Sequence, residues 1–133
     1  NVGPTDPHGL LSNRNLVLWQ YTRVKDARLE LNDDVIRIHA RAELPPCKIG
    51  YFSRRGVIAY WRKDVLFVKR FASLIDQLHP DSNCNAEVYC NDQFIELETL
   101  GPLSSIEPSR SVTHVETWEL HSGGNIPGRS SGA

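Results

Sequence analysis

Residues 83–102 read NCNAEVYCNDQFIELETLGP, and this stretch predicts the element around which the rest of the chain is organised. It contains two strand patterns, at residues 86–89 and 94–100, with residues 90–93 between them. The Asn and Asp of that connection favour a turn, because both tolerate left-handed backbone and bond to their own main chain. Gly101 and Pro102 end the second strand. We therefore expect a β-hairpin here, near the centre of the fold.

Alternation along the second strand separates an apolar face from an acidic one. The odd-numbered residues from Ile95 to Thr99 point to one side of the strand, and Glu96 and Glu98 point to the other. Glu87 on the neighbouring strand can join them, which gathers three carboxylates on one face. This is the only acidic group in the sequence whose arrangement suggests chemistry.

Short strand patterns recur along the whole chain, about eight in all at a spacing of roughly 8–12 residues. Besides the hairpin they cover residues 15–21, 29–31, 35–40, 48–52, 57–62, 65–71 and 111–120. Gly56 is expected in a left-handed turn, and residues 72–78 are the one stretch that suggests a turn or two of helix. We predict an all-β fold, an antiparallel β-sandwich over residues 15–121, with a flexible arm at 1–14 and a disordered tail at 122–133.

Length and charge exclude several classes of protein. The chain has 133 residues and a net charge of −1, which indicates one domain without the electrostatic footprint of a nucleic-acid or membrane-surface binder. The sequence contains no apolar run long enough to cross a bilayer and no signal-peptide pattern. The histidines are scattered and no zinc-ligand spacing is present, so we expect no metal.

The three cysteines, Cys47, Cys84 and Cys90, make an odd count. A secreted disulfide scaffold uses more cysteines, in even number. We therefore expect reduced thiols in a cytoplasmic protein, with a Cys84–Cys90 bridge across the hairpin as the less favoured alternative.

Four segments together resemble the C-terminal half of a galactose-mutarotase-like (aldose-epimerase-like) family of unassigned function. They are VLFVKRF at 65–71, CNAEVY at 84–89 with Asn91 and Asp92, ELETLGP at 96–102, and SVTHVETWEL at 111–120. The resemblance covers about residues 16–121. It implies a supersandwich of two large antiparallel sheets with a sugar-sized groove on the concave face. The family that the chain resembles runs to about twice this length, and in the well-understood mutarotases a carboxylate base and histidines interconvert sugar anomers without a cofactor.

The carboxylates Glu87, Glu96 and Glu98 are the first candidate ligand contacts. Mutarotation needs a base for the anomeric hydroxyl and an acid for the ring oxygen, and carboxylates also accept hydrogen bonds from sugar hydroxyls. We expect them to form a polar cluster with Lys69. The alternative, slightly favoured, is a solvated face on which these charges pair with Lys69 or Arg70.

The other candidates lie on two further strands. Lys69 and Arg70 follow an apolar run, and a structural ion pair is the favoured interpretation over a ligand contact. His114, Glu116 and Trp118 share one strand face, where the indole could stack on a sugar ring while the other two bond hydroxyls. The favoured alternative is a core Trp118 with His114 near the edge.

Two kinds of function follow. One is a sugar-binding domain, related to epimerases or mutarotases; a lyase for acidic sugars would need a basic groove, which Lys48, Lys69 and Arg70 could supply. The other is a non-catalytic structural or interaction domain, a truncated relic of the larger fold that oligomerises.

Trp19 and Trp61 are predicted core residues. Because several strands carry apolar residues on both faces, we expect a homodimer in which a second copy covers the face left open.

Overall fold

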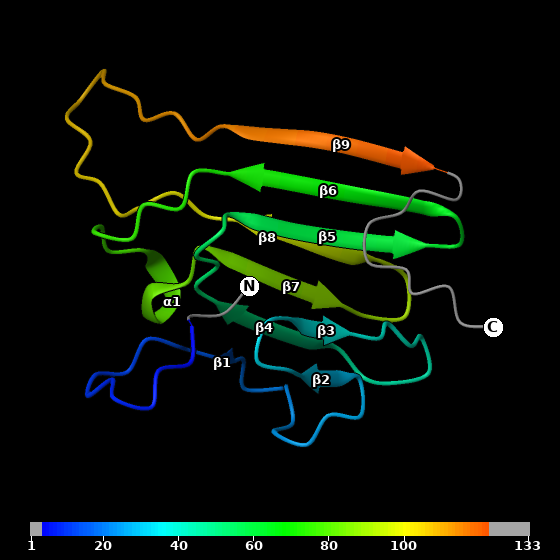
Figure 1. Cartoon of the computed structure of the whole chain (residues 1–133). Helices are drawn as coiled ribbons and strands as arrows, with labels where there is room; N and C mark the ends of the chain where they lie inside the picture. The colour runs from blue at the N-terminus through cyan, green and yellow to red at the C-terminus, as the bar shows by residue number, and fades with distance from the viewer. Residues whose placement is uncertain (1–3, 123–133) are drawn as a thin grey trace.

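A computed structural model describes residues 4–122, which form two layers of antiparallel strands (Figure 1). The predicted all-β antiparallel sandwich is confirmed. Residues 123–133 of the predicted tail lie outside the described residues. The elements are β1 (Val17–Leu18), β2 (Leu29–Leu31), β3 (Ile36–Ile38), β4 (Cys47–Tyr51), β5 (Val57–Arg62), β6 (Val65–Phe71), α1 (Pro80–Asn83), β7 (Ala86–Cys90), β8 (Ile95–Thr99) and β9 (Glu116–Ser122).

One layer is a four-stranded sheet in the order β1-β4-β7-β8. The other layer consists of a three-stranded sheet, β5-β6-β9, and the separate β2-β3 pair. Figure 1 shows β5 in front of β8 and β3 in front of β4, and packing contacts join both pairs. The predicted hairpin is β7-β8, but it does not lie at the centre of the fold, because β8 is an edge strand of its sheet. The last strand, β9, pairs with β6 and not with β8.

The core lies between the two layers and comes from strand alternation. Ile49 of β4 is 1% exposed on the face of the four-stranded sheet that the β2-β3 pair covers. Ile58 of β5 and Phe71 of β6 pack against the same sheet near Ala86. Leu97 of β8 joins this cluster, so the predicted core side of the second hairpin strand is confirmed. We call this side of each sheet its inner face and the opposite side its outer face.

Turns form where the sequence indicates them. The Asn91 side chain accepts hydrogen bonds from the backbone N–H groups of Gln93 and Phe94, both at 2.8 Å, and so closes the β7-β8 turn. Gly56 has a φ of +58°, as predicted. A Cβ atom there would lie 2.0 Å from the carbonyl oxygen of Phe71, so only glycine fits.

The helical turn lies later in the chain than predicted. Residues 72–78 contain no helix, and the short α1 follows them at Pro80–Asn83. Asp81, Ser82 and Asn83 have φ values of 49°, 59° and 69°, a left-handed turn that Asp and Asn tolerate better than most residues. The Asn15 side-chain amide donates to the backbone oxygens of Ser82 and Asn83, at 3.3 and 3.2 Å, and holds this turn against the segment that leads into β1.

Two predictions about the three-stranded sheet are wrong. The last strand begins at Glu116 and not at residue 111, because its partner β6 ends at Phe71, directly opposite Glu116. Trp61 and Trp118 are not core residues, since they are 47% and 65% exposed. Trp118 is exposed because β9 extends past the edge of the four-stranded sheet, as Figure 1 shows.

Candidate functional site

A lysine and two glutamates meet on the outer face of the four-stranded sheet. Glu87 on β7 lies directly opposite Glu98 on β8, and Lys48 projects from the same face of the adjacent strand β4. The Lys48 ammonium nitrogen lies 2.8 Å from Glu87 Oε2 and 2.9 Å from Glu98 Oε2. One cation is therefore shared by two carboxylates. We call these three residues the Lys48 cluster.

Burial governs the electrostatics of the Lys48 cluster. Glu87 is 1% exposed, and this burial raises its pKa above the ordinary value, while the Lys48 charge only partly offsets the effect. The neighbouring Asp81 carboxyl raises the pKa of Glu87 further. Burial alone would lower the pKa of Lys48, but its hydrogen bonds with Glu87 and Glu98 outweigh burial and raise it. Lys48 is therefore charged at any physiological pH.

Two carboxylate oxygens of the Lys48 cluster remain without a hydrogen-bond donor. Glu87 Oε1 and Glu98 Oε1 are buried and have no hydrogen-bond partner among the described residues. Buried polar atoms of this kind are uncommon and call for an explanation. Glu98 lies nearer the surface, because 32% of its side chain is exposed against 2% for Glu87. Its free oxygen is the acceptor that a ligand can reach with the smaller rearrangement.

Aromatic rings surround the Lys48 cluster on the same face. The Lys48 ammonium lies 4.8 Å from the centre of a Trp19 ring. Tyr89 contacts Tyr21 edge-on, with ring centres 6.4 Å apart, and contacts Phe94 at 5.7 Å. Tyr21 and Phe94 are 47% and 48% exposed, so this face offers apolar ring surfaces beside its charged groups.

The Cys84 thiol lies close to Gly50, next to the Lys48 cluster. A Cβ atom at Gly50 would lie 2.7 Å from Cys84 Sγ and 3.2 Å from the Trp19 ring, so glycine is required for this close packing. Burial raises the pKa of the Cys84 thiol to about 12, and the nearby Glu87 charge adds to the effect. All three cysteines are free and buried, and the Cys84–Cys90 bridge does not form.

A second polar group lies at the edge of β8, between the two layers. Glu116 accepts hydrogen bonds from the Trp118 indole at 2.7 Å, from the Lys69 ammonium at 3.3 Å and from the Thr99 hydroxyl. Thr99 is also hydrogen-bonded to His114, at 2.8 Å. Burial tends to raise the pKa of Glu116, but these three donors outweigh it and lower the pKa. Both oxygens of this carboxylate are satisfied, in contrast to Glu87 and Glu98.

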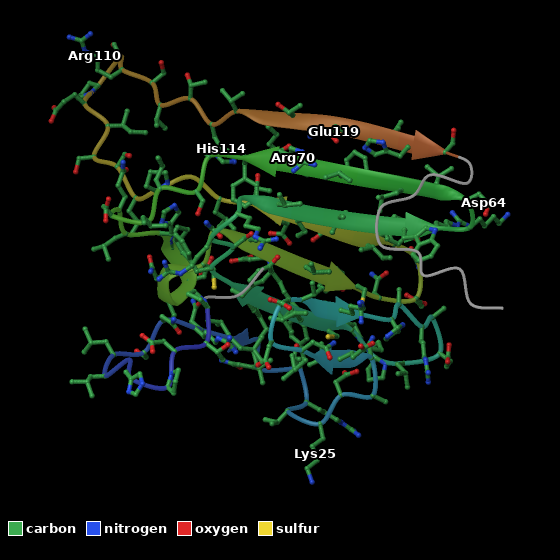
Figure 2. All side chains as sticks on the ribbon, viewed as in Figure 1. Lys25, Asp64, Arg70, Arg110, His114 and Glu119 are labelled. Atoms are coloured by element: carbon green, nitrogen blue, oxygen red, sulfur yellow. The ribbon has the colours of Figure 1, made fainter. Side chains whose placement is uncertain are left out.

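The predicted site residues therefore separate into distinct places. Glu87 and Glu98 come together, but the expected cluster with Lys69 is wrong, because Lys69 projects from the inner face of the other sheet. Glu96 shares the outer face with Glu98 but is exposed. Arg70 pairs with Glu119 on the outer face of the three-stranded sheet, where Figure 2 shows the two side by side. Lys69, His114, Glu116 and Trp118 are the residues that the β8 edge brings together.

Sequence reasoning missed the role of Lys48 and the aromatic residues around it. The sequence suggests Lys48 only as a cation for a basic groove, and Trp19 only as a core residue. A usable signal was present, because Lys48 and Gly50 alternate with the apolar residues Cys47, Ile49 and Tyr51. That alternation places Lys48 on the face of β4 opposite the core.

Comparison with known proteins adds no assignment. Searches against family models, curated proteins and solved structures find no match to this chain. Residues 4–122 contain no group of three or more His, Cys, Asp or Glu side chains placed to hold a metal ion. Within that same range, the single short helix is far from long enough to cross a membrane.

Proposed function

We propose that this chain is a carbohydrate-binding domain whose ligand site lies on the outer face of the four-stranded sheet, around Glu98. The observation that carries the proposal is the buried Glu98 Oε1, an acceptor without a donor among the described residues, on a face that also carries the half-exposed ring of Tyr21. A sugar offers both complements, since its hydroxyls donate hydrogen bonds and the C–H face of its ring packs on aromatic surfaces.

The charges of the site favour a neutral sugar. When both carboxylates are ionised, Lys48 neutralises one of them and the cluster carries a formal charge of −1. That charge disfavours phosphates and acidic sugars, and with them the lyase alternative. We infer further that the domain works in the cytoplasm, because its three cysteines are free thiols.

The raised pKa of Glu87 favours a second candidate on the same site, interconversion of sugar anomers, as the resemblance to mutarotases implies. This reaction needs one group that holds a proton and one that accepts it. Carboxylates in different environments can divide these roles. Glu87 is the more buried, and its raised pKa makes it the acid candidate, with Glu98 as the base.

Ligand-observed NMR with a panel of neutral monosaccharides tests both candidates. Saturation transfer from the protein should detect at least one sugar, and exchange spectroscopy on its anomeric protons would reveal turnover. Because hydrogen bonds to charged groups are worth about 1.5–3 kcal/mol, Glu98→Gln should weaken binding by about tenfold or more. Tyr21→Ala should weaken it as well.

Glu119→Gln is the matched control, because it changes a paired carboxylate on the other sheet and should leave sugar affinity unchanged. If no sugar in the panel binds, or if binding is the same in Glu98→Gln, Tyr21→Ala and the wild type, this assignment is wrong.

A further inference from the structure

The two layers of the sandwich are offset, so that one projects beyond the other. In Figure 1, β6 and β9 lie above β8, and no described strand of the four-stranded sheet lies behind them. The inner face of this projecting part carries Phe67, Trp118 and Leu120. Trp118 and Leu120 are 65% and 75% exposed. Trp118 is also held in place, packed edge-on against Phe67 at 5.6 Å and hydrogen-bonded to Glu116.

Each layer also ends in an unpaired strand at this offset. Among the described residues, β8 pairs only with β7, and β9 pairs only with β6. Open edges invite another strand. At β8, the Lys69 ammonium donates to the Leu97 carbonyl at 2.7 Å, so this one acceptor of the edge already has a donor within the chain, and the projecting sheet lies directly beside the edge.

We propose that two copies of this chain join at the offset, with their projecting sheets packed inner face to inner face. A two-fold axis parallel to the strands, midway between the layers, places the three-stranded sheet of each copy in the layer of the partner's four-stranded sheet. The surface is then self-complementary, as an isologous dimer requires. The β9 strand of each copy comes to lie beside β8 of the other.

Strand direction agrees with this arrangement. β9 and β8 run in opposite directions in Figure 1, and rotation about an axis parallel to the strands preserves the direction of each. The partner's β9 is therefore antiparallel to β8, and antiparallel pairing is what all neighbouring strands within residues 4–122 adopt. Each layer then continues from the four strands of one copy into the three strands of the other.

The chemistry of the buried surface is suitable for a stable contact. Trp118 and Leu120 supply exposed apolar area at its centre, and stable interfaces bury roughly 800 Å² per partner. The charges on this face are already paired, since Lys69 lies 3.3 Å from Glu116. Their burial therefore leaves no lone charge. With a net charge of −1 per chain, repulsion between copies is small.

This dimer does not depend on sugar binding, because the Lys48 cluster lies on the opposite face of the four-stranded sheet. Sedimentation equilibrium of the full chain should therefore give twice the 15.0 kDa chain mass at micromolar concentration, with or without ligand. Leu120→Lys should raise the dimer dissociation constant by about tenfold or more, because the lysine charge would be buried. Val24→Lys, at another exposed apolar position, should leave it unchanged.

Amide hydrogen exchange distinguishes this arrangement from other dimers. Raising the protein concentration should protect the open-edge amides of both β8 and β9, because each strand gains a partner. Simple pairing of β9 with β9 would protect β9 alone. A monomer at micromolar concentration, a dimer that Leu120→Lys leaves intact, or protection confined to β9 would each overturn the proposal.

Discussion

Replacing Lys48 with methionine tests whether the Lys48 cluster behaves as a buried, coupled unit. Methionine keeps an apolar stem of similar length but removes the cation that Glu87 and Glu98 share. Only 2% of the Glu87 side chain is exposed, so its carboxylate would remain buried without a counter-charge. Removing one partner of such a pair costs roughly 3–5 kcal/mol, and we expect the free energy of unfolding to fall by that amount at neutral pH.

The size of this loss should depend on pH, because Glu87 can take up a proton. Burial raises the folded-state pKa of Glu87 above the ordinary 4.5, and the Lys48 charge partly opposes this rise. Removing Lys48 therefore raises the pKa of Glu87 further. At pH values between 4.5 and the raised pKa, the folded protein binds more protons at Glu87 than the unfolded chain does. Stability conferred at this site is therefore lost as pH rises through that window. Lys48→Met should come closest to the wild type at or below pH 4.5.

Urea unfolding followed by circular dichroism between pH 4 and pH 8 measures this loss. The double variant Lys48→Met/Glu87→Gln should recover most of the stability, because it removes the stranded charge. Arg70→Met is the matched control, since its pair with Glu119 is solvent-exposed and should be worth less than about 1 kcal/mol. If Lys48→Met and Arg70→Met cost the same at every pH, the Lys48 cluster is solvated and the reasoning is refuted.

Two further predictions concern the backbone and the thiols. Gly56→Ala should destabilise the fold by more than about 1 kcal/mol, because φ is +58° and the new Cβ would meet the Phe71 carbonyl oxygen; an unchanged urea midpoint would contradict this. A thiol reagent should label no cysteine of the folded protein and all three cysteines after unfolding, because all three are buried. Burial also raises the pKa of the Cys47 thiol to about 11 and of the Cys84 thiol to about 12, which disfavours the reactive thiolate. Rapid labelling of the native protein would show that these thiols are accessible.

Local patterns in the sequence predict the strands well. The bounds of β5 and β6 match the alternating segments 57–62 and 65–71, and Asn91 closes the β7-β8 turn as its chemistry suggests. These features depend on neighbouring residues, which the sequence displays directly. The late start of β9 shows the limit, because a strand extends only as far as its partner, and β6 ends at Phe71.

Side-chain partners could not be predicted, because they depend on which strands become neighbours. By sequence alone, Glu87 can pair with Lys69 as well as with any other lysine, and it is the pairing of β4 with β7 that decides between them. The same pairing brings Lys48 within 2.8 Å of Glu87. The offset between the layers is equally non-local, and it explains why Trp118, an ordinary core residue by composition, is 65% exposed.

Strand β8 takes part in both the proposed sugar site and the proposed dimer, through different parts of its surface. Its outer face carries Glu98, part of the proposed sugar site, and its inner face carries Leu97 in the core. Its open edge is the place where we propose that a second copy pairs. Because a strand's faces and its edge lie in different directions, a ligand on Glu98 and a partner strand do not compete for the same atoms.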